Sequence, residues 1–287
     1  VSEAAISARI SAARAAIDDD GKRQAWIRTV PRRGFRFVGA VETAGGGAPA
    51  KAPHKPADQS QRIAFCRSRD GTRIAYATSG GGYPLVRAGH LLTHLEHDWH
   101  SPIWRPMLDR LNGSFRLIRY DQRGNGLSDW EIGPLSLDRF VDDLEAVVDA
   151  AGLDRFALYG TSQGAPIAVA FAHRHPGRVS HLALHGGFEK GRLIRADESE
   201  RAQAEAILTL MRHGWGRPGS AFIDAFAALF IPDGDREQIG SLVELQHRTT
   251  SPENGVALRA AVDRPDFSYL APALGFPTLV LHSRHDA

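Results

Sequence analysis

The serine at position 162 has the surroundings of a catalytic nucleophile. It lies in the run Gly160-Thr161-Ser162-Gln163-Gly164, where small residues at positions 160, 161 and 164 permit a tight turn. Such a turn holds the serine in a strained conformation and places the backbone N–H of Gln163 where it can receive an oxyanion. The pattern therefore predicts acyl chemistry that begins with attack by the Ser162 hydroxyl.

The residues on either side of this turn fit a strand and a helix. The segment 155–159 is a short apolar run typical of a buried strand, and 165–172 is an apolar helical run. Pro166 lies in the first helical turn, where its missing N–H costs little. Because a serine hydroxyl is a weak nucleophile at neutral pH, the chemistry also needs an imidazole base and a carboxylate that orients the imidazole.

Short apolar strands alternate with helical segments, which predicts an α/β fold with a mostly parallel sheet. The expected strands are 63–67, 74–78, 83–88, 117–120, 155–159, 179–187 and 278–282, with a hairpin turn at Asp70-Gly71 and a helix over 137–151. Residues 121–128 read Asp-Gln-Arg-Gly-Asn-Gly-Leu-Ser, the pattern D-x-R-G-x-G-x-S. Together with the G-x-S-x-G turn, this loop resembles the α/β-hydrolase family. The resemblance implies the sheet of that fold and a helical lid over about 190–270.

The resemblance also implies a catalytic acid. The family order along the chain is serine, acid, histidine, and Asp286 at the end of the last expected strand matches the acid. Only Ala287 follows, so no histidine of this chain occupies the family position, and His285 beside the acid would point away from it. Three earlier histidines read as surface or packing residues: His173, His175 and His181. We expect a fragment truncated at both ends, inactive by itself, whose parent protein carries the histidine.

A second oxyanion donor is expected from the loop after the third strand of the domain. Many relatives have His-Gly there, whereas this chain has Ala88-Gly89-His90-Leu91, so the candidates are the backbone N–H groups of Gly89, His90 and Leu91. The spacing of His90, His94 and His97 also invites a metal site on one helical face. The segment equally resembles the H-L-E-x-D-W stretch of hydrolases fused to regulatory or cyclase modules, without metal. We expect no metal and no other cofactor.

The first 41 residues follow a different pattern. Ile6, Ile10, Ala13 and Ile17 recur at helical spacing, and the segments 26–30 and 35–38 flank a Pro-Arg-Arg-Gly turn as a β-hairpin. Over residues 1–39, this helix and hairpin resemble the recognition helix and wing of OmpR/PhoB-type transcriptional regulators.

In that family the helix enters the DNA major groove and the wing touches backbone or minor groove. The resemblance implies that exposed side chains of both elements contact DNA, mostly its phosphates. These residues are Ser7, Arg9, Ser11, Arg14, Arg32 and Arg33. The alternative is an ordinary amphipathic helix with solvated arginines. Because the sheet and two helices that precede this helix in the family are absent, DNA binding is assigned to the intact parent protein.

Composition bounds the remaining choices. The chain has 287 residues, of which 43% are hydrophobic, enough for one large domain or for a large and a small one. Residues 1–41 carry a net charge of +4 and the other 246 carry −2, so the basic charge lies at the N-terminal end. The Gly-, Ala- and Pro-rich stretch 42–60 reads as a linker between a partial winged helix over 1–41 and a hydrolase domain over 61–287. A single cysteine, Cys66, and the lack of a signal peptide or membrane-spanning run favour a cytoplasmic location.

Three functions stay open on the sequence. The first is a DNA-binding transcriptional regulator fused to a hydrolase that cleaves a small ester-like substrate. The second is a hydrolase-fold module that senses a ligand, with slow turnover or none, and thereby controls DNA binding. The third is a truncated gene product with neither activity. Four lid aromatics either line an apolar pocket or simply pack: Trp215, Phe222, Phe226 and Phe230. Homodimerisation is left open, and no membrane partner is expected.

Overall fold

The computed structural model of the chain describes residues 7, 10, 11, 13–15, 17–30, 34–38, 60–195, 197–217, 220–273 and 275–283. Two compact units make up the chain, Val1–Pro53 and His54–Ala287. We call them the N-terminal unit and the C-terminal unit. The boundary between them falls within the stretch expected to be a linker.

The N-terminal unit contains the expected hairpin. Strand β1 (Ile27–Val30) pairs antiparallel with β2 (Gly34–Phe37), and Ile27 lies opposite Phe37. The described positions between 7 and 15 are helical, and Ser7 and Ser11 are exposed as expected. The other candidate DNA contacts Arg9, Arg32 and Arg33 lie outside the described residues.

Arg14 does not lie where the sequence predicts. It was expected to be exposed and to face DNA, but only 7% of its surface is accessible. Its guanidinium donates to the carbonyl oxygen of Ile27 at 2.8 Å and to Thr29 Oγ1 at 3.1 Å, and it lies over the Phe35 ring. Arg14 therefore fastens the helix to the hairpin, because the strand supplies acceptors that match the guanidinium donors.

The carboxylate of Asp19 organises the turn that leads into the hairpin. It accepts backbone N–H groups from Asp20, Ala25, Trp26 and Ile27, at 2.8–3.0 Å. Desolvation alone would raise the pKa of Asp19, but these hydrogen bonds outweigh it and lower the pKa to about 2. The stabilisation that Asp19 provides is therefore complete above its unfolded pKa near 4 and is lost as the pH falls towards 2.

We expect Asp19→Ala to release the hairpin, because four backbone donors lose their acceptor. Hydrogen–deuterium exchange over residues 24–38 at pH 7 checks this, with Asp18→Asn as the matched neighbour. Equal exchange in both variants and in the unsubstituted chain would contradict the role of Asp19.

The C-terminal unit is built on a seven-stranded sheet in the order β3-β4-β6-β5-β7-β8-β9. The strands are β3 (Arg62–Arg67), β4 (Arg73–Gly80), β5 (Tyr83–Arg87), β6 (Phe115–Tyr120), β7 (Phe156–Thr161), β8 (Val179–His185) and β9 (Thr278–Leu281). The hairpin at Asp70-Gly71 joins β3 and β4 as an antiparallel pair, β6 pairs antiparallel with the other edge of β4, and the remaining neighbours are parallel. The mostly parallel sheet predicted from the alternation is confirmed.

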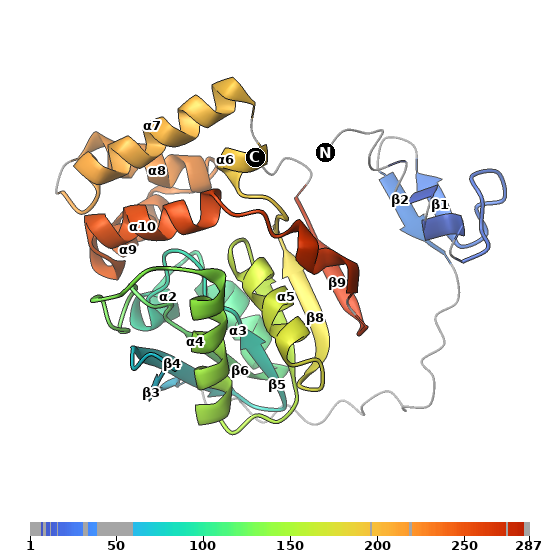
Figure 1. Cartoon of the computed structure of the whole chain (residues 1–287), viewed down its shortest axis with the longest axis horizontal. Coiled ribbons are helices and arrows are strands. Elements are labelled where there is room, and N and C mark those ends of the chain that lie inside the picture. The colour runs from blue at the N-terminus through green and yellow to red at the C-terminus, as the bar shows by residue number, and fades with distance from the viewer. Residues whose placement is uncertain are drawn as a thin grey trace. The chain divides into compact units, whose positions relative to one another are not determined.

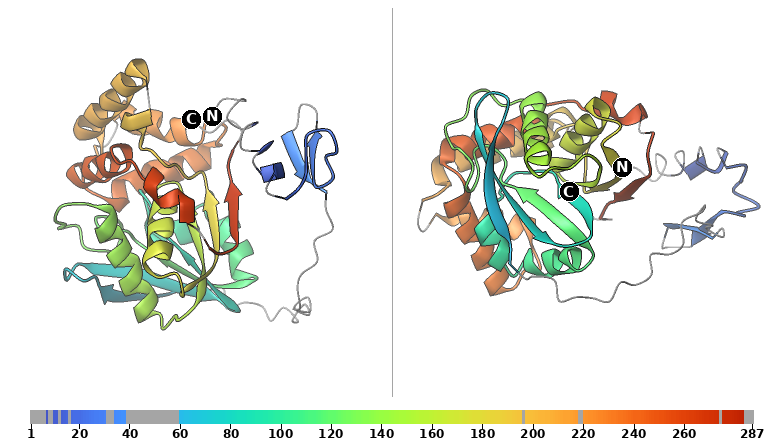
Figure 2. Two further views of the ribbon diagram at one scale, coloured as in Figure 1. Left: turned by 45° about the vertical axis from the view of Figure 1, so that its right-hand side comes forward. Right: turned by 90° about the horizontal axis from the view of Figure 1, so that it is seen from below.

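Helices cover both faces of this sheet (Figures 1 and 2). Alternation along each strand sends Val86, Ile118 and Leu158 towards α4 (Leu137–Ala150) and α5 (Gly164–Arg174), where the main core lies. Leu85 and Leu117 point to the opposite face, against α2 (Leu95–His100) and α3 (Arg105–Asn112). Strand β7, which leads to Ser162, lies inside the sheet between β5 and β8.

The predicted lid is helical and follows β8 along the chain (Figure 1). Its elements are α6 (Arg192–Arg195), α7 (Glu198–Gly214), α8 (Ala221–Phe230), α9 (Arg236–Thr249), α10 (Pro252–Asp263) and the 3₁₀ helix η1 (Ser268–Ala273). Trp215 and Phe226 are 1% exposed within the apolar core of the lid, and Phe222 packs against it. These aromatics therefore act in packing, whereas Phe230 is half exposed. Among the described helices, none is long and apolar enough to cross a membrane.

Candidate active site

Ser162 occupies the sharp turn between β7 and α5. Its φ of +51° lies in the left-handed region that non-glycine residues avoid, so the predicted strain is confirmed. The Ser162 N–H donates to the carbonyl of His185 on β8 at 2.9 Å, and the Ser162 carbonyl accepts the N–H of Ala165 at 3.0 Å. A Cβ at Gly160 would lie 2.5 Å from the carbonyl oxygen of Gly164, so the turn closes only around glycine. The serine side chain is left exposed.

The loop between β5 and α2, residues 88–94, packs against the same turn. A Cβ at Gly164 would lie 3.1 Å from the carbonyl oxygen of Ala88 and 3.2 Å from that of Gly89. Gln163 stands at the N-terminus of α5, where free backbone N–H groups and the helix dipole favour negative charge. The geometry thus brings the sequence-predicted segments around Ser162 and Gly89 together. Which of Gly89, His90 and Leu91 donates a second N–H stays a prediction.

The His90 side chain turns into the protein interior. Arg87 Nη2 donates to His90 Nε2 at 2.7 Å, which leaves Nδ1 as the protonated nitrogen, 2.7 Å from the carbonyl oxygen of Leu91. Burial, followed by the neighbouring Arg87 charge, lowers the pKa of His90 to about 3. The imidazole is therefore neutral and already hydrogen-bonded at both nitrogens, so His90 can serve the site through its backbone.

The alternative metal site on one helical face is wrong. Helix α2 begins only at Leu95, and His94 caps it by accepting the N–H of His97 at 3.3 Å. His90 lies four residues before the cap, so the three histidines do not share a helical face. Within the described ranges, no group of three or more His, Cys, Asp or Glu side chains is arranged to hold a metal ion.

The other predicted triad residue, Asp286, lies outside the described residues, as does His285. In the part of the chain that the structure describes, no hydrogen bond joins a side chain to Ser162 Oγ. His173 Nε2 lies 2.6 Å from the carbonyl oxygen of Leu270, and His175 lies 3.4 Å from Glu145, so both pack as expected. His185, which the sequence did not single out, lies beside the serine backbone but pairs its Nδ1 with the Tyr159 hydroxyl.

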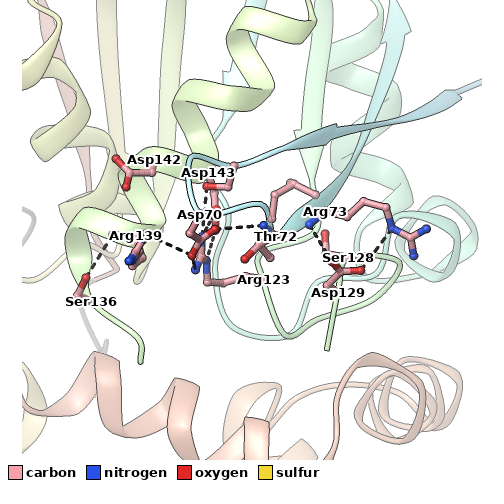
Figure 3. A network of polar contacts seen from close by, with 12 residues as sticks. Asp70, Thr72, Arg73, Arg123, Ser128, Asp129, Ser136, Arg139, Asp142 and Asp143 are labelled. Atoms are coloured by element: carbon pink, nitrogen blue, oxygen red, sulfur yellow. Dashed lines mark hydrogen bonds and ion pairs between the residues drawn. The ribbon is translucent and has the colours of Figure 1, made fainter. Parts of the chain in front are cut away.

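Polar contacts of the D-x-R-G-x-G-x-S loop join neighbouring elements of the C-terminal unit (Figure 3). Arg123, fully buried, binds both carboxylate oxygens of Asp143 on α4, at 2.6 and 2.7 Å, and reaches Asp70 at 2.8 Å. Burial opposes the guanidinium charge, but these hydrogen bonds outweigh it and raise the pKa of Arg123. Ser128 Oγ donates to the carbonyl of Asp121 at 2.6 Å. These contacts are structural, and they join β6, α4 and the β3–β4 hairpin.

A groove of about 770 Å³ lies elsewhere, between α2, α9 and the start of β3. Its lining includes His97, Trp99, Ser241 and Glu244 but not Ser162 or Gln163. The groove is therefore distinct from the turn that carries the serine.

Comparison with known proteins identifies the family. The alpha/beta hydrolase fold family matches residues 90–266, and this chain belongs to it. A RutD protein of Azorhizobium caulinodans, named for carbamate hydrolysis, is 33% identical over 117 residues, which cover 41% of this chain and 42% of the relative. The match thus spans less than half of that protein. A pyrrolizixenacetamide deacetylase of Xenorhabdus hominickii is 24% identical over 227 residues, 78% of this chain and 77% of the relative.

Solved structures agree on the fold. The enol-lactonase from Burkholderia xenovorans LB400 aligns with a TM-score of 0.60 and 23% identity, over 77% of this chain and 82% of that chain. The family match lies entirely within the C-terminal unit. The winged-helix resemblance of residues 1–39 therefore stays a prediction.

Proposed function

We propose that the C-terminal unit is a serine hydrolase that cleaves a small ester-like acyl substrate, with Ser162 as its nucleophile. The observation that carries the proposal is the exposed serine at φ +51°, held between a strand end and a helix N-terminus. Strain at such a position persists only where the surrounding structure imposes it, and it is typical of nucleophile turns. The packing of the 88–94 loop against Gly164 adds a second source of N–H donors beside the serine.

In the proposed reaction, Ser162 Oγ attacks the carbonyl carbon of the substrate while its proton passes to a histidine base. The substrate oxygen becomes an oxyanion and accepts N–H groups from Gln163 and from the 88–94 loop. The leaving alcohol or amine takes the proton from the imidazolium and leaves an acyl ester on Ser162. Water then attacks this ester with help from the same base, and the acid is released.

Asp286 is the proposed partner of that base, and the family order of serine, acid and histidine would place the base after Asp286. The names of the relatives point to acyl substrates: a carbamate, an acetamide and an enol-lactone. All three reactions break a bond between a carbonyl carbon and a heteroatom. We propose a substrate of this class for the present chain.

Labelling with a fluorophosphonate, followed by intact-mass measurement, tests the proposal. The parent protein, continued past Ala287, is expected to gain a single adduct, and Ser162→Ala none. Ser114→Ala, an exposed serine away from the turn, is the matched control and should react like the parent. A Ser162-dependent adduct on residues 1–287 alone would contradict the need for a histidine after Asp286. Absence of any adduct on the folded parent protein would favour the ligand-sensing alternative.

We also propose that the N-terminal unit contacts nucleic acid phosphates in the parent protein. Arg28 and Arg36 lie directly opposite each other on β1 and β2, and both are exposed. Like charges in this register destabilise a hairpin, so a bound anion would relieve the repulsion. Arg14 does not share this role, because it is buried. The ligand-sensing alternative would use these contacts as its output.

Fluorescence anisotropy with a labelled DNA duplex at several salt concentrations tests this proposal. The double substitution of Arg28 and Arg36 by alanine is expected to weaken binding and to reduce the salt slope by about two. The control is Arg110→Ala in the C-terminal unit. Equal affinity and slope in all three proteins would contradict the proposal.

A further inference from the structure

The 88–94 loop, which packs on the serine turn at one end, is attached to the lid at the other. Leu92 has a φ of +62°, an unusual value for a leucine. Its side chain is 6% exposed and belongs to the apolar core of the lid with Met211, Trp215 and Leu245. Packing in the lid core thus compensates for backbone strain in the loop.

A hydrogen bond fixes the next residue of the loop to the lid. Thr249, the last residue of α9, is fully buried, and its hydroxyl donates to the carbonyl oxygen of Thr93 at 2.6 Å. The carbonyl of Thr249 in turn accepts the N–H of Gly126 at 2.7 Å. Thr93 Oγ1 accepts the N–H of Gln122 at 3.2 Å. One threonine at the end of a lid helix therefore joins the 88–94 loop to the D-x-R-G-x-G-x-S loop.

A third attachment lies just beyond the loop. His97 Nε2 lies 2.9 Å from the carbonyl oxygen and 3.2 Å from the hydroxyl of Ser241, one residue before the buried Leu242 of α9. The same helix α9 thus contacts the chain on both sides of His94. On the opposite side, Arg87 holds the His90 ring and Gly89 lies against the serine turn.

We infer that the lid sets the position of the 88–94 loop, and that Thr249 is a positioning residue for the oxyanion donor of that loop. The inference rests on the proposed function, because it assumes that the loop supplies an N–H to the reacting oxygen. An oxyanion donor is effective only within about 2.7–3.1 Å of the charge it stabilises. A loop released from the lid would lose that placement, although Ser162 and Gln163 would keep theirs.

Two substitutions of Thr249 distinguish the effect of its hydroxyl group from the effect of its side-chain volume. Thr249→Val keeps the volume and removes the donor, whereas Thr249→Ser keeps the donor. Hydrogen–deuterium exchange in the present chain should rise several-fold over residues 89–95 in Thr249→Val. In Thr249→Ser it should stay at the level of the unsubstituted chain. Exchange in β3 and β4 is the internal reference and should not change. Leu92→Ala, which withdraws the loop from the lid core, is the second variant and should raise exchange in the same segment.

Labelling of Ser162 by a fluorophosphonate in the parent protein provides the functional readout. Thr249→Val is expected to slow the limiting rate of labelling about tenfold, since a donor removed outright costs about 10²–10³. The probe concentration for half-maximal rate should not change, and Thr249→Ser should restore the rate. If Thr249 had a purely structural role, Thr249→Val would not lower the limiting rate while it leaves the probe concentration for half-maximal rate unchanged.

The outcomes distinguish the two proposals. If the parent protein is not labelled at Ser162, the hydrolase proposal fails, and the exchange measurement still decides whether the lid holds the loop. If labelling occurs but Thr249→Val matches the parent in rate and in exchange over 89–95, the positioning role is overturned. A rise in exchange spread evenly over the sheet would also overturn it.

Discussion

Replacement of Arg123 by methionine is expected to lower the free energy of unfolding of the C-terminal unit by about 3–5 kcal/mol. The side chains of Arg123 and Asp143 are both 0% exposed, and two hydrogen bonds of 2.6 and 2.7 Å join them. Methionine fills much of the space but leaves the Asp143 carboxylate buried without its counter-charge. The penalty for that unpaired charge exceeds the net stabilisation of the intact pair.

Urea unfolding of matched variants measures this effect. Arg139→Met removes an exposed arginine that contacts the same Asp70 at 3.3 Å, and is expected to cost under about 1 kcal/mol. The double variant Arg123→Met with Asp143→Leu should recover much of the lost stability, because the buried carboxylate that lost its counter-charge is then also removed. If the double variant is less stable than Arg123→Met, the account of an uncompensated carboxylate is wrong.

The sequence predicted those parts of the structure that depend on neighbours along the chain. The strand at 155–159, the helix after Gly164 and the strain at Ser162 all follow from residues within one short window. The hairpin at Asp70-Gly71 and the two strands of the N-terminal hairpin are local in the same sense. For these elements, periodicity and turn residues decide the structure before tertiary contacts form.

Contacts between segments that are distant along the chain could not be predicted from such local patterns. Arg14 looked like a surface residue because its acceptors on Ile27 and Thr29 come from a strand 13 and 15 residues later. The left-handed Leu92 gives no sequence signal, since the lid core that stabilises it lies more than 100 residues away. The spacing of His90, His94 and His97 suggested a helix. His90 lies instead in the 88–94 loop, which packs against Gly164 and against the lid. The serine turn could therefore be predicted, but not the loop that faces it.

Asp121, the first residue of the D-x-R-G-x-G-x-S loop, is expected to make the C-terminal unit less stable as the pH rises from about 4 to about 7. Complete burial raises the pKa of Asp121 to about 7, and the neighbouring Asp98 charge adds to the effect. Hydrogen bonds from the N–H groups of Leu127 and Leu95, and the nearby Arg119, oppose it without cancelling it. The folded protein therefore holds a proton that the unfolded chain has released, so stability falls with pH across this interval.

Asp121→Asn keeps an oxygen acceptor for the two N–H groups and removes the titration. Relative to the parent, its free energy of unfolding should increase by about 3 kcal/mol between pH 5 and pH 8, since each unit of pKa difference corresponds to about 1.4 kcal/mol. Urea unfolding at four pH values measures the difference, with the exposed Glu131→Gln as the control for surface charge. Parallel stability curves for the parent and Asp121→Asn would show that the carboxylate is already ionised at pH 5 in the folded protein, and that the two N–H groups and Arg119 outweigh its burial.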